Sequence, residues 1–171
     1  MTEKDTSLTM ADIDKLALEI SAPGGPGTKD WDMGSSHTKT VNDAVMDGLR
    51  SNKGKIPGEL EGVPALIITT TGAKTGKKRT LPLACQEIDG RLIIIASMGG
   101  APRNPPWFHN LLHCPEVLIE KDGESFSARA VVTEGDDRDH LFQIVCENLP
   151  VFASYQKRTE RIIPVIELIR Q

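Results

Sequence analysis

The stretch that decides the fold is residues 65–95, ALIITTTGAKTGKKRTLPLACQEIDGRLIII. It begins with an apolar, β-branched run from Ala65 to Thr71, and further runs of the same kind follow at 79–88 and 91–96. Asp89-Gly90 separates the last two runs, and Asp-Gly between two β runs is a strong signal for a two-residue hairpin turn. The stretch therefore predicts antiparallel neighbours rather than parallel strands joined by helices.

The rest of the chain adds strands and helices around this hairpin. A β run at 116–132 is divided by a second Asp-Gly pair, Asp122-Gly123, and a closing strand is expected at 162–169. Helices are expected where apolar residues recur every three to four positions, namely at 10–20, 39–49, 105–113 and 134–148, with a short turn at 151–158.

The apolar stripes of these helices define the faces that we expect to be buried. The stripe of the helix at 39–49 consists of Val41, Ala44, Val45 and Leu49, and that of the helix at 134–148 consists of Leu141, Ile144, Val145 and Leu149. Together the elements predict a mainly β (α+β) domain over 39–171, a small and partly open antiparallel β-barrel with flanking helices. A helical segment, 1–38, would precede it as a candidate lid.

Composition limits the class of protein. The 171 residues are 39% hydrophobic and 26% charged, which is ordinary for a soluble domain. No apolar run approaches the roughly 20 residues of a membrane helix, and the polar start of the chain lacks the apolar region of a signal peptide. We expect a cytoplasmic protein, a monomer or weak homodimer, with no integral membrane span; association with a membrane surface stays open. The net charge of −4 and the 4% aromatic content argue against a nucleic-acid partner.

The loop from Thr71 to Arg79 holds four basic side chains in the six residues 74–79, although the protein as a whole is acidic. Gly72 and Gly76 let the backbone come close to a ligand, so the loop has the character of a phosphate or carboxylate socket. The alternative is a solvated hairpin turn. A Walker A motif is excluded, because the two glycines enclose three residues rather than four.

A second loop, SMGGAPRNPPW at 97–107, connects a strand to a helix. Its two glycines and exposed N–H groups would permit a planar ligand to approach the backbone, and Arg103 adds a cation. The alternative is an ordinary connection, with Trp107 and Phe108 in the core. The only tyrosine, Tyr155, can donate a proton or a hydrogen bond, or can simply pack at the edge of the core.

Metal binding and thiol chemistry find little support. His109 and His113 stand four residues apart on one helix, but no third ligand or His-Glu-x-x-His motif accompanies them, so no metal is expected. The three cysteines, Cys85, Cys114 and Cys146, are odd in number, are widely spaced and have no base partner in the sequence. They are typical of a reduced intracellular protein.

Four ordered blocks carry a family pattern. They are TTTGAKTGKKRTLPL at 69–83, ASMGGAPRNPPWFHNL at 96–111, PEV at 115–117 and YxxxTxRxIPV at 155–165. This pattern resembles the deazaflavin-dependent nitroreductase family of coenzyme F-420 reductases, which have a split antiparallel β-barrel of the FMN-binding type. The resemblance covers about residues 40–169, and segment 1–38 carries little of it.

The resemblance implies a cofactor, a reduced deazaflavin with an anionic phosphate and oligoglutamate tail, and it implies roles for residues. Lys74, Thr75 and Arg79 would hold the tail with Arg103 as a further cation. Lys77 and Lys78 would compensate for Ala73, where relatives often carry arginine. The ring site would be lined by Ser97, Met98 (a variable position), Gly99, Gly100, Ala101, Trp107 and Asn110. Tyr155 would stand on the substrate side and, with Ser97, form the catalytic pair.

The implied function is hydride transfer from reduced coenzyme F-420 to an electron-poor acceptor: an activated C=C bond such as an enone, a quinone or a nitroarene. Solvent or Tyr155 would supply the proton. The alternatives are a protein that binds FMN or haem on the same barrel, and a non-catalytic carrier of the deazaflavin. Because segment 1–38 would contribute much of the substrate side, nitroimidazole reduction is not assumed.

Overall fold

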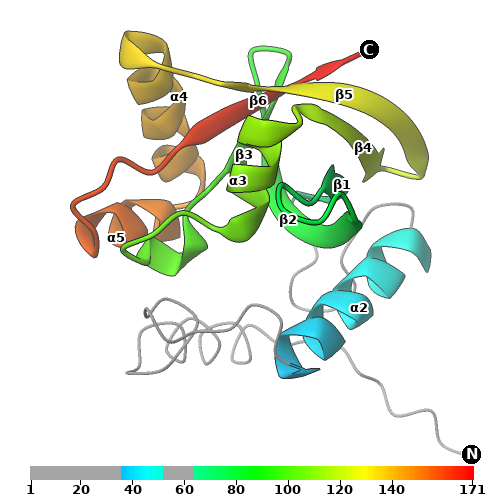
Figure 1. The fold of residues 1–171 in the computed structure, drawn as a ribbon. Helices are drawn as coiled ribbons and strands as arrows, with labels where there is room; N and C mark the ends of the chain where they lie inside the picture. The colour runs from blue at the N-terminus through cyan, green and yellow to red at the C-terminus, as the bar shows by residue number, and fades with distance from the viewer. Residues whose placement is uncertain (1–35, 52–63) are drawn as a thin grey trace, which may run out of the picture.

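The computed structural model describes residues 36–51 and 64–171. The helix expected at 10–20 and residues 1–35 of the candidate lid lie outside these residues. The described part consists of a β-barrel with one helix at its mouth, two helices against one wall and one helix against another (Figure 1).

Six antiparallel strands form the barrel: β1 (Ala65–Thr71), β2 (Lys78–Ile88), β3 (Arg91–Ile95), β4 (Glu116–Lys121), β5 (Glu124–Val132) and β6 (Val165–Arg170). Their order is β1-β2-β3-β6-β5-β4, and β4 pairs with β1. The barrel is thus closed, where the sequence predicted a partly open one, and closure leaves no strand edge unpaired. The mainly β, antiparallel fold class is confirmed.

Both predicted Asp-Gly hairpins are present. Asp89 and Gly90 have φ values of 53° and 75°, and Asp122 and Gly123 have φ values of 53° and 81°. Positive φ at both central residues is the geometry of the tight turn whose twist matches that of paired strands. The turns therefore fix the register of β2 with β3 and of β4 with β5.

Within the described residues, five helical elements accompany the barrel: α2 (Ser36–Ser51), the short 3₁₀ turn η2 (Met98–Gly100), α3 (Pro106–His113), α4 (Gly135–Asn148) and α5 (Val151–Lys157). α3, α4 and α5 agree with the predicted helices to within one residue at each end. α2 begins three residues before the predicted start, and η2 was not predicted. β6 begins at Val165 rather than at 162, because Ile163 bonds to side chains of α4 and α5 instead of to a strand.

The barrel interior and the mouth helix share one apolar core. Trp107, Phe108 and Leu111 of α3 pack with inward residues of the strands, such as Ile68 and Ile94. α3 therefore closes one end of the barrel (Figure 1). The loop that leads into α3 is consequently held at this end.

A second core lies between one barrel wall and the helices α4 and α5. Leu141, Val145 and Phe152 pack on Ile93 and Ile95, the residues of β3 that alternate with the inward-facing ones. β3 is thus covered on both faces, which explains its unbroken apolar sequence. Of the predicted α4 stripe, Leu141 and Val145 are fully buried, and Ile144 and Leu149 are partly buried against this core.

A third, smaller contact joins α2 to the outer face of β1. Met46 and Leu49 are buried against Ala65 and Ile67, with Val45 partly buried beside them. Ala44, which the sequence placed on the buried face, is exposed, and the larger Met46 supplies the contact instead. The side chain of Val41 lies outside the described residues.

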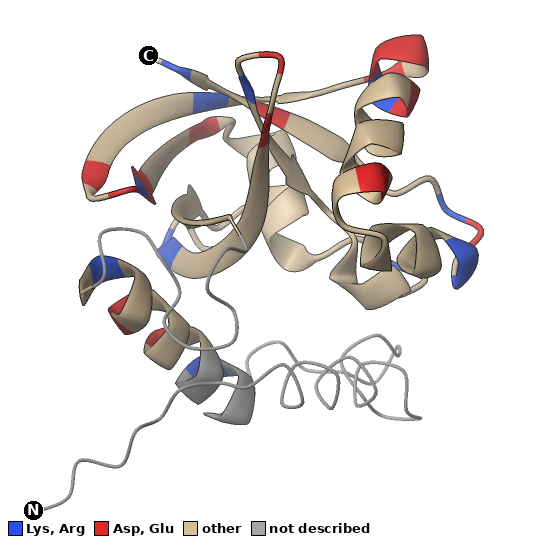
Figure 2. Cartoon of the chain, turned by 180° about the vertical axis from the view of Figure 1, so that it is seen from behind, with Lys and Arg blue, Asp and Glu red and all other residues tan. Residues whose placement is uncertain are grey.

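Acidic residues gather at the start of α4, where Asp136 and Asp137 occupy the first turn (Figure 2). Carboxylates at this position complement the partial positive charge of a helix N-terminus. Asp137 also accepts a bidentate hydrogen bond from Arg91, at 2.7 and 2.9 Å, and Arg91 in turn pairs with Glu167 on β6. These charges tie α4 to the barrel wall at the end of β3 remote from α3.

Candidate functional site

The basic loop between β1 and β2 is closed by its own backbone. The N–H of Gly72 donates to the carbonyl of Lys77, and the N–H of Gly76 donates to the carbonyl of Gly72, both at 2.8 Å. A Cβ on Gly72 would lie 2.8 Å from Thr75 Oγ1, and Gly76 has a φ of 67°. The turn itself therefore requires both glycines.

Asn110 on α3 connects this loop to the mouth of the barrel. Its Oδ1 accepts a hydrogen bond from the N–H of Ala73 at 2.9 Å, and its Nδ2 donates to Thr70 Oγ1 at 3.1 Å. Asn110 is partly buried and uses both ends of its amide in these bonds. The resemblance placed Asn110 at the ring site; the structure gives it contacts that hold the basic loop beside α3.

The cations of the loop face solvent. Lys74, Lys77 and Arg79 are exposed, and none of them forms a salt bridge with a residue that the structure describes. Lys78 Nζ donates to Thr71 Oγ1 at 2.8 Å. By contrast, Arg50, Arg91, Arg129 and Arg170 each have a carboxylate partner. The loop thus presents positive charge that no described carboxylate compensates, the donor set that a phosphate or a polycarboxylate tail requires.

The loop that leaves β3 has an unusual backbone. Ser97 has right-handed helical angles, φ −75° and ψ −41°, and Met98 follows in the left-handed region with φ 46°. Successive residues of this kind turn their N–H groups toward one point, a concavity that binds anions or carbonyl oxygens. In the part of the chain that the structure describes, the N–H groups of Ser97, Met98 and Gly99 have no hydrogen-bond acceptor. We call these three N–H groups the amide nest.

Met98 makes this nest strained. A left-handed conformation costs a residue with a Cβ about 1–2 kcal/mol. Such strain persists only where surrounding contacts impose it, and it is concentrated at functional sites. Here the imposing contacts include the N–H of Gly100 donating to the carbonyl of Ser97 at 2.9 Å and that of Ala101 donating to the carbonyl of Met98 at 3.1 Å.

Arg161 holds the other side of the same loop. Its Nε donates to the carbonyl of Ala101 at 2.7 Å, and its Nη2 donates to the carbonyl of Ser97 at 2.8 Å. Its Nη1 donates to Asn104 Oδ1 at 2.7 Å and to the carbonyl of Ala96 at 3.3 Å. All of these acceptors are neutral, and burial lowers the pKa of the Arg161 guanidinium from its usual value.

Gly100 brings the loop against α5. A Cβ on Gly100 would lie 2.5 Å from the carbonyl oxygen of Tyr155 and 3.0 Å from Arg158 Cβ, and φ at Gly100 is 81°. Only glycine fits this contact without a shift of the backbone. Tyr155 itself is half-buried and packs edge-on against Phe152, with ring centroids 5.8 Å apart. The close approach thus places the only tyrosine next to the loop that carries the nest.

The remaining predicted residues differ in exposure. Trp107 is 5% exposed and lies in the barrel core, which is the alternative that the sequence left open. Ala101 and Ser97 are buried, and Arg103 and Thr75 are exposed. The Ser97 hydroxyl has no partner among the described residues. It must therefore reach solvent, since no fully buried side-chain oxygen or nitrogen there lacks a partner.

Sequence reasoning missed Arg161, Asn104 and Gln156 as parts of the site. Gln156 Nε2 donates to the carbonyl of Arg161 at 2.8 Å, and Gln156 Oε1 accepts from the N–H of Ile163 at 3.1 Å. Arg161 stands inside the fourth block of the family pattern, so the sequence did mark this residue. The contacts of Arg161 could not be predicted from that block, because they join residues about 60 positions apart.

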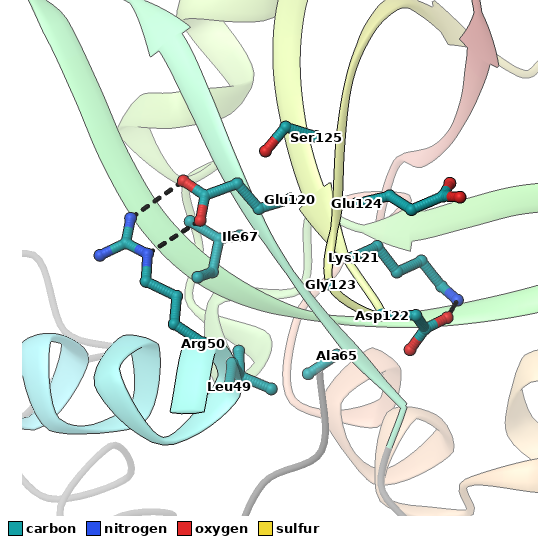
Figure 3. Close-up of a pocket in the computed structure, with 10 residues that line it drawn as sticks. All are labelled: Leu49, Arg50, Ala65, Ile67, Glu120, Lys121, Asp122, Gly123, Glu124 and Ser125. Carbon is teal, nitrogen blue, oxygen red and sulfur yellow. Dashed lines mark hydrogen bonds and ion pairs between the residues drawn. The ribbon is translucent and has the colours of Figure 1, made fainter. Parts of the chain in front are cut away.

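Other parts of the described chain do not add to the site. A cavity of about 150 Å³ lies between α2, β1 and the β4–β5 hairpin, and none of the predicted site residues lines it (Figure 3). Burial raises the pKa of the Cys85 thiol to about 12, so this cysteine stays protonated. Within residues 36–51 and 64–171, no group of three or more His, Cys, Asp or Glu side chains could hold a metal, and no helix could cross a membrane.

Comparison with known proteins agrees with the geometry. A family model described as F420H(2)-dependent quinone reductase matches residues 43–169. An F420H(2)-dependent quinone reductase of Mycobacterium tuberculosis (strain ATCC 25618 / H37Rv) is 39% identical over 135 residues, which cover 77% of this chain and 89% of the relative.

Solved structures show the same fold. One, described as an F420-H2 dependent reductase, is 38% identical, has a TM-score of 0.56, and is matched over 61% of this chain and 93% of that chain. Another, described as a domain-swapped dimer, is 33% identical with a TM-score of 0.58, over 78% of this chain and 99% of that chain.

These matches confirm the family resemblance, the split-barrel fold and coenzyme F-420 as the cofactor. The predicted reaction, hydride transfer from reduced coenzyme F-420 to an electron-poor acceptor, is confirmed with them. Since the family model spans most of the chain, this oxidoreductase belongs to the F420H(2)-dependent quinone reductase family.

Proposed function

We propose that the loop 72–79 binds the anionic tail of F-420, and that the amide nest receives the electron-rich end of its ring. The observation that carries this proposal is the arrangement at one end of the barrel. A loop whose cations have no described carboxylate partner is tied through Asn110 to α3, and the amide nest precedes α3 in the chain. A ligand with a planar head and a charged tail fits that arrangement.

The donor set fits the cofactor on chemical grounds. Lys74, Lys77 and Arg79 can each make a charge-assisted hydrogen bond to a phosphate or carboxylate, while Thr75 and Lys78 remain engaged within the turn. The nest offers N–H groups to a carbonyl oxygen or to a nitrogen that gains negative charge. Such preorganised donors stabilise charge that develops during the reaction.

The deazaflavin, when bound, supplies the hydride. The protein orients it and its acceptor and keeps the backbone donors fixed. Ser97 is placed to add a hydroxyl donor beside the nest, because its Oγ has no partner among the described residues. Tyr155, which contacts this loop through Gly100, is proposed to hold the acceptor oxygen and to deliver a proton to it.

For the acceptor we propose a quinone, following the names of the family and of its curated relatives. A quinone takes up one hydride and one proton to become the quinol, so the site needs a proton source next to the ring. Tyr155 and solvent meet that need. Enones and nitroarenes remain acceptors to compare with the quinone in the same assay.

We also propose that the chain acts in the cytoplasm, without nucleic acid, as a monomer or weak homodimer. Three free cysteines fit a reducing compartment, and a net charge of −4 opposes binding to phosphate backbones. One similar solved structure is described as a domain-swapped dimer. Light scattering over a range of protein concentrations distinguishes a monomer from a homodimer.

The test of the cofactor site is a side-by-side titration of the purified protein with F-420 and with FMN. We expect F-420 to bind more tightly, with an affinity that falls as salt is added, and reduced F-420 to be oxidised when menadione is present. Tighter binding of FMN, or binding of F-420 without turnover of any acceptor, would contradict the proposal.

A further inference from the structure

We propose that Arg161 is a positioning residue for hydride transfer, which holds the amide nest in its active shape and joins it to the helix that carries Tyr155. This inference rests on the cofactor site proposed above. It assigns to Arg161 a role toward the cofactor through the protein backbone, not through direct contact.

The hydrogen bonds of Arg161 carry the first step. Four of its five N–H donors point to one loop, residues 96–104, at donor–acceptor distances of 2.7 to 3.3 Å. In a peptide group the C=O and the next N–H point in opposite directions. By fixing the carbonyls of Ala96 and Ser97, Arg161 therefore turns the N–H groups of Ser97 and Met98 away from itself and into the nest.

The electrostatics carry the second step. Arg161 has no carboxylate partner among the described residues, so its full positive charge lies behind the loop. The charge polarises the peptide groups whose carbonyls it binds, and their N–H groups become stronger donors. A guanidinium is suited to this task, because its planar fork meets several acceptors at once, which the point charge of a lysine cannot do.

Arg161 is itself held from behind, which carries the third step. Gln156 on α5 donates to the Arg161 carbonyl at 2.8 Å. Arg138 on α4 donates to the carbonyl of Ile163 at 2.7 Å and 3.2 Å through two of its nitrogens. Gln156 neighbours Tyr155 in sequence, so the same contacts that place Arg161 also place the tyrosine. The nest and the tyrosine are thereby held in one frame.

The test compares Arg161→Lys with Arg91→Lys. Arg91 is a matched control because it also makes four hydrogen bonds, to Asp137 and Glu167. It lies at the far end of β3, on the order of 20 Å from Ser97 at strand spacing. Both variants keep the positive charge and lose the fork. They differ in the place of the lost bonds and in the acceptors, which are carboxylates for Arg91 and neutral oxygens for Arg161.

We expect Arg161→Lys to lower kcat about tenfold to hundredfold, the usual effect of a small misplacement at a reacting centre. F-420 affinity should fall about tenfold. In the protein without cofactor, amide exchange at Gly100 should become faster, because Arg161 no longer holds the Ser97 carbonyl that accepts its N–H. Arg91→Lys should lose about as much thermal stability as Arg161→Lys. It should leave kcat, F-420 affinity and amide exchange near their wild-type values.

Each contrary result has its own meaning. Unchanged exchange at Gly100, or unchanged F-420 affinity and kcat with only a lower melting temperature, would overturn the positioning role while leaving the cofactor site intact. Failure of the wild-type protein to bind F-420 would contradict the proposed function itself. If Arg161→Lys does not fold, Asn104→Ala tests the same point. Asn104→Ala removes one acceptor of the Arg161 guanidinium. It must speed amide exchange and lower kcat, as expected for Arg161→Lys, or the proposal fails.

Discussion

At the scale of single residues, the site depends on conformations that few side chains tolerate. Met98 accepts left-handed strain, and Gly100 avoids a collision with the carbonyl oxygen of Tyr155. Neither requirement is visible in the identity of the residue alone. Both arise from the contact between the loop after β3 and α5.

Gly100→Ala tests this contact. The new Cβ would lie 2.5 Å from the carbonyl oxygen of Tyr155, so the backbone of the loop or of α5 must shift. Gly123→Ala is the control, since it has the same φ of 81° but no heavy atom within 4 Å of the new Cβ. We expect the control to lose about 1–2 kcal/mol of unfolding free energy from backbone strain, and Gly100→Ala to lose at least about 1 kcal/mol more. Denaturant unfolding measures both, and equal losses would refute the steric contact.

Tyr155→Phe tests the proposed proton donor. The variant removes one oxygen and retains the ring that packs on Phe152, so fold and F-420 affinity should be preserved. Quinone reduction should fall by roughly 100-fold, the contribution of general acid catalysis. A smaller fall with a raised KM would indicate positioning of the acceptor without proton transfer. Wild-type kinetics with several acceptors would leave the proton to solvent.

At the scale of elements, the basic loop and α3 act as one unit. The loop is closed by two backbone hydrogen bonds and then tied to α3 by Asn110. Its cations are therefore displayed from a fixed backbone, although their side chains are exposed. A fixed backbone reduces the entropy that must be lost when a ligand binds to these cations.

Lys74→Ala and Arg79→Ala test the cations of this loop. Each should weaken F-420 binding by about 1.5–3 kcal/mol, the contribution of a charge-assisted hydrogen bond. The loss should be smaller at high salt, which already screens the tail. Arg129→Ala is the control, because it removes an exposed cation of β5 whose partner is Glu116. An equal effect of all three variants would mean that only net charge matters, and no effect of the first two would make the loop a solvated turn.

Asn110→Ala tests how the loop is held. It removes the acceptor of the Ala73 N–H and the donor to Thr70 Oγ1, and it keeps every cation. We expect F-420 affinity to fall several-fold and the salt dependence to remain, because charge is unchanged while its placement loosens. Isothermal titration at two salt concentrations measures both. Wild-type affinity would show that the bridge to α3 has no part in tail binding.

At the scale of the whole molecule, α2 is attached to the barrel by a small contact. Met46 and Leu49 cover Ala65 and Ile67, and Arg50 makes a bidentate hydrogen bond to Glu120 on β4 at 2.8 and 2.9 Å (Figure 3). The hydrogen bond from Arg50 lowers the pKa of the Glu120 carboxyl. A carboxyl with a lowered folded-state pKa stabilises the fold above its unfolded pKa, and this contribution is lost as pH falls through the folded pKa.

Glu120→Gln should therefore reduce the unfolding free energy near pH 7 by up to about 1 kcal/mol, since the pair is partly exposed. The difference from wild type should disappear as pH falls below 4.5, the ordinary value for a glutamate, and through the lowered one. Glu116→Gln is the control on the same strand. The side chains of the Arg129–Glu116 pair are 53% and 52% exposed, against 47% and 27% for the Arg50–Glu120 pair. A difference that persists in acid would mean that the glutamine acts through packing and not through charge.

The sequence by itself determined the local features of this protein. Strand runs, Asp-Gly turns and helical stripes are set by neighbouring residues, so the elements were predicted to within a few residues. The family pattern likewise lies in short blocks, and it identified the cofactor and the reaction. A prediction fails at this scale where packing chooses between similar residues, as when Met46 and not Ala44 was buried.

Only the tertiary structure decided how the barrel closes and how the site is held. Closure depends on the pairing of β1 with β4, and the nest depends on Arg161 reaching Ser97 across 64 positions. No local pattern encodes such contacts, because they form only when distant elements have been brought together by the shared core. For the same reason the structure, and not the sequence, distinguished Trp107 as a core residue and Asn110 as the bridge between the basic loop and the barrel mouth.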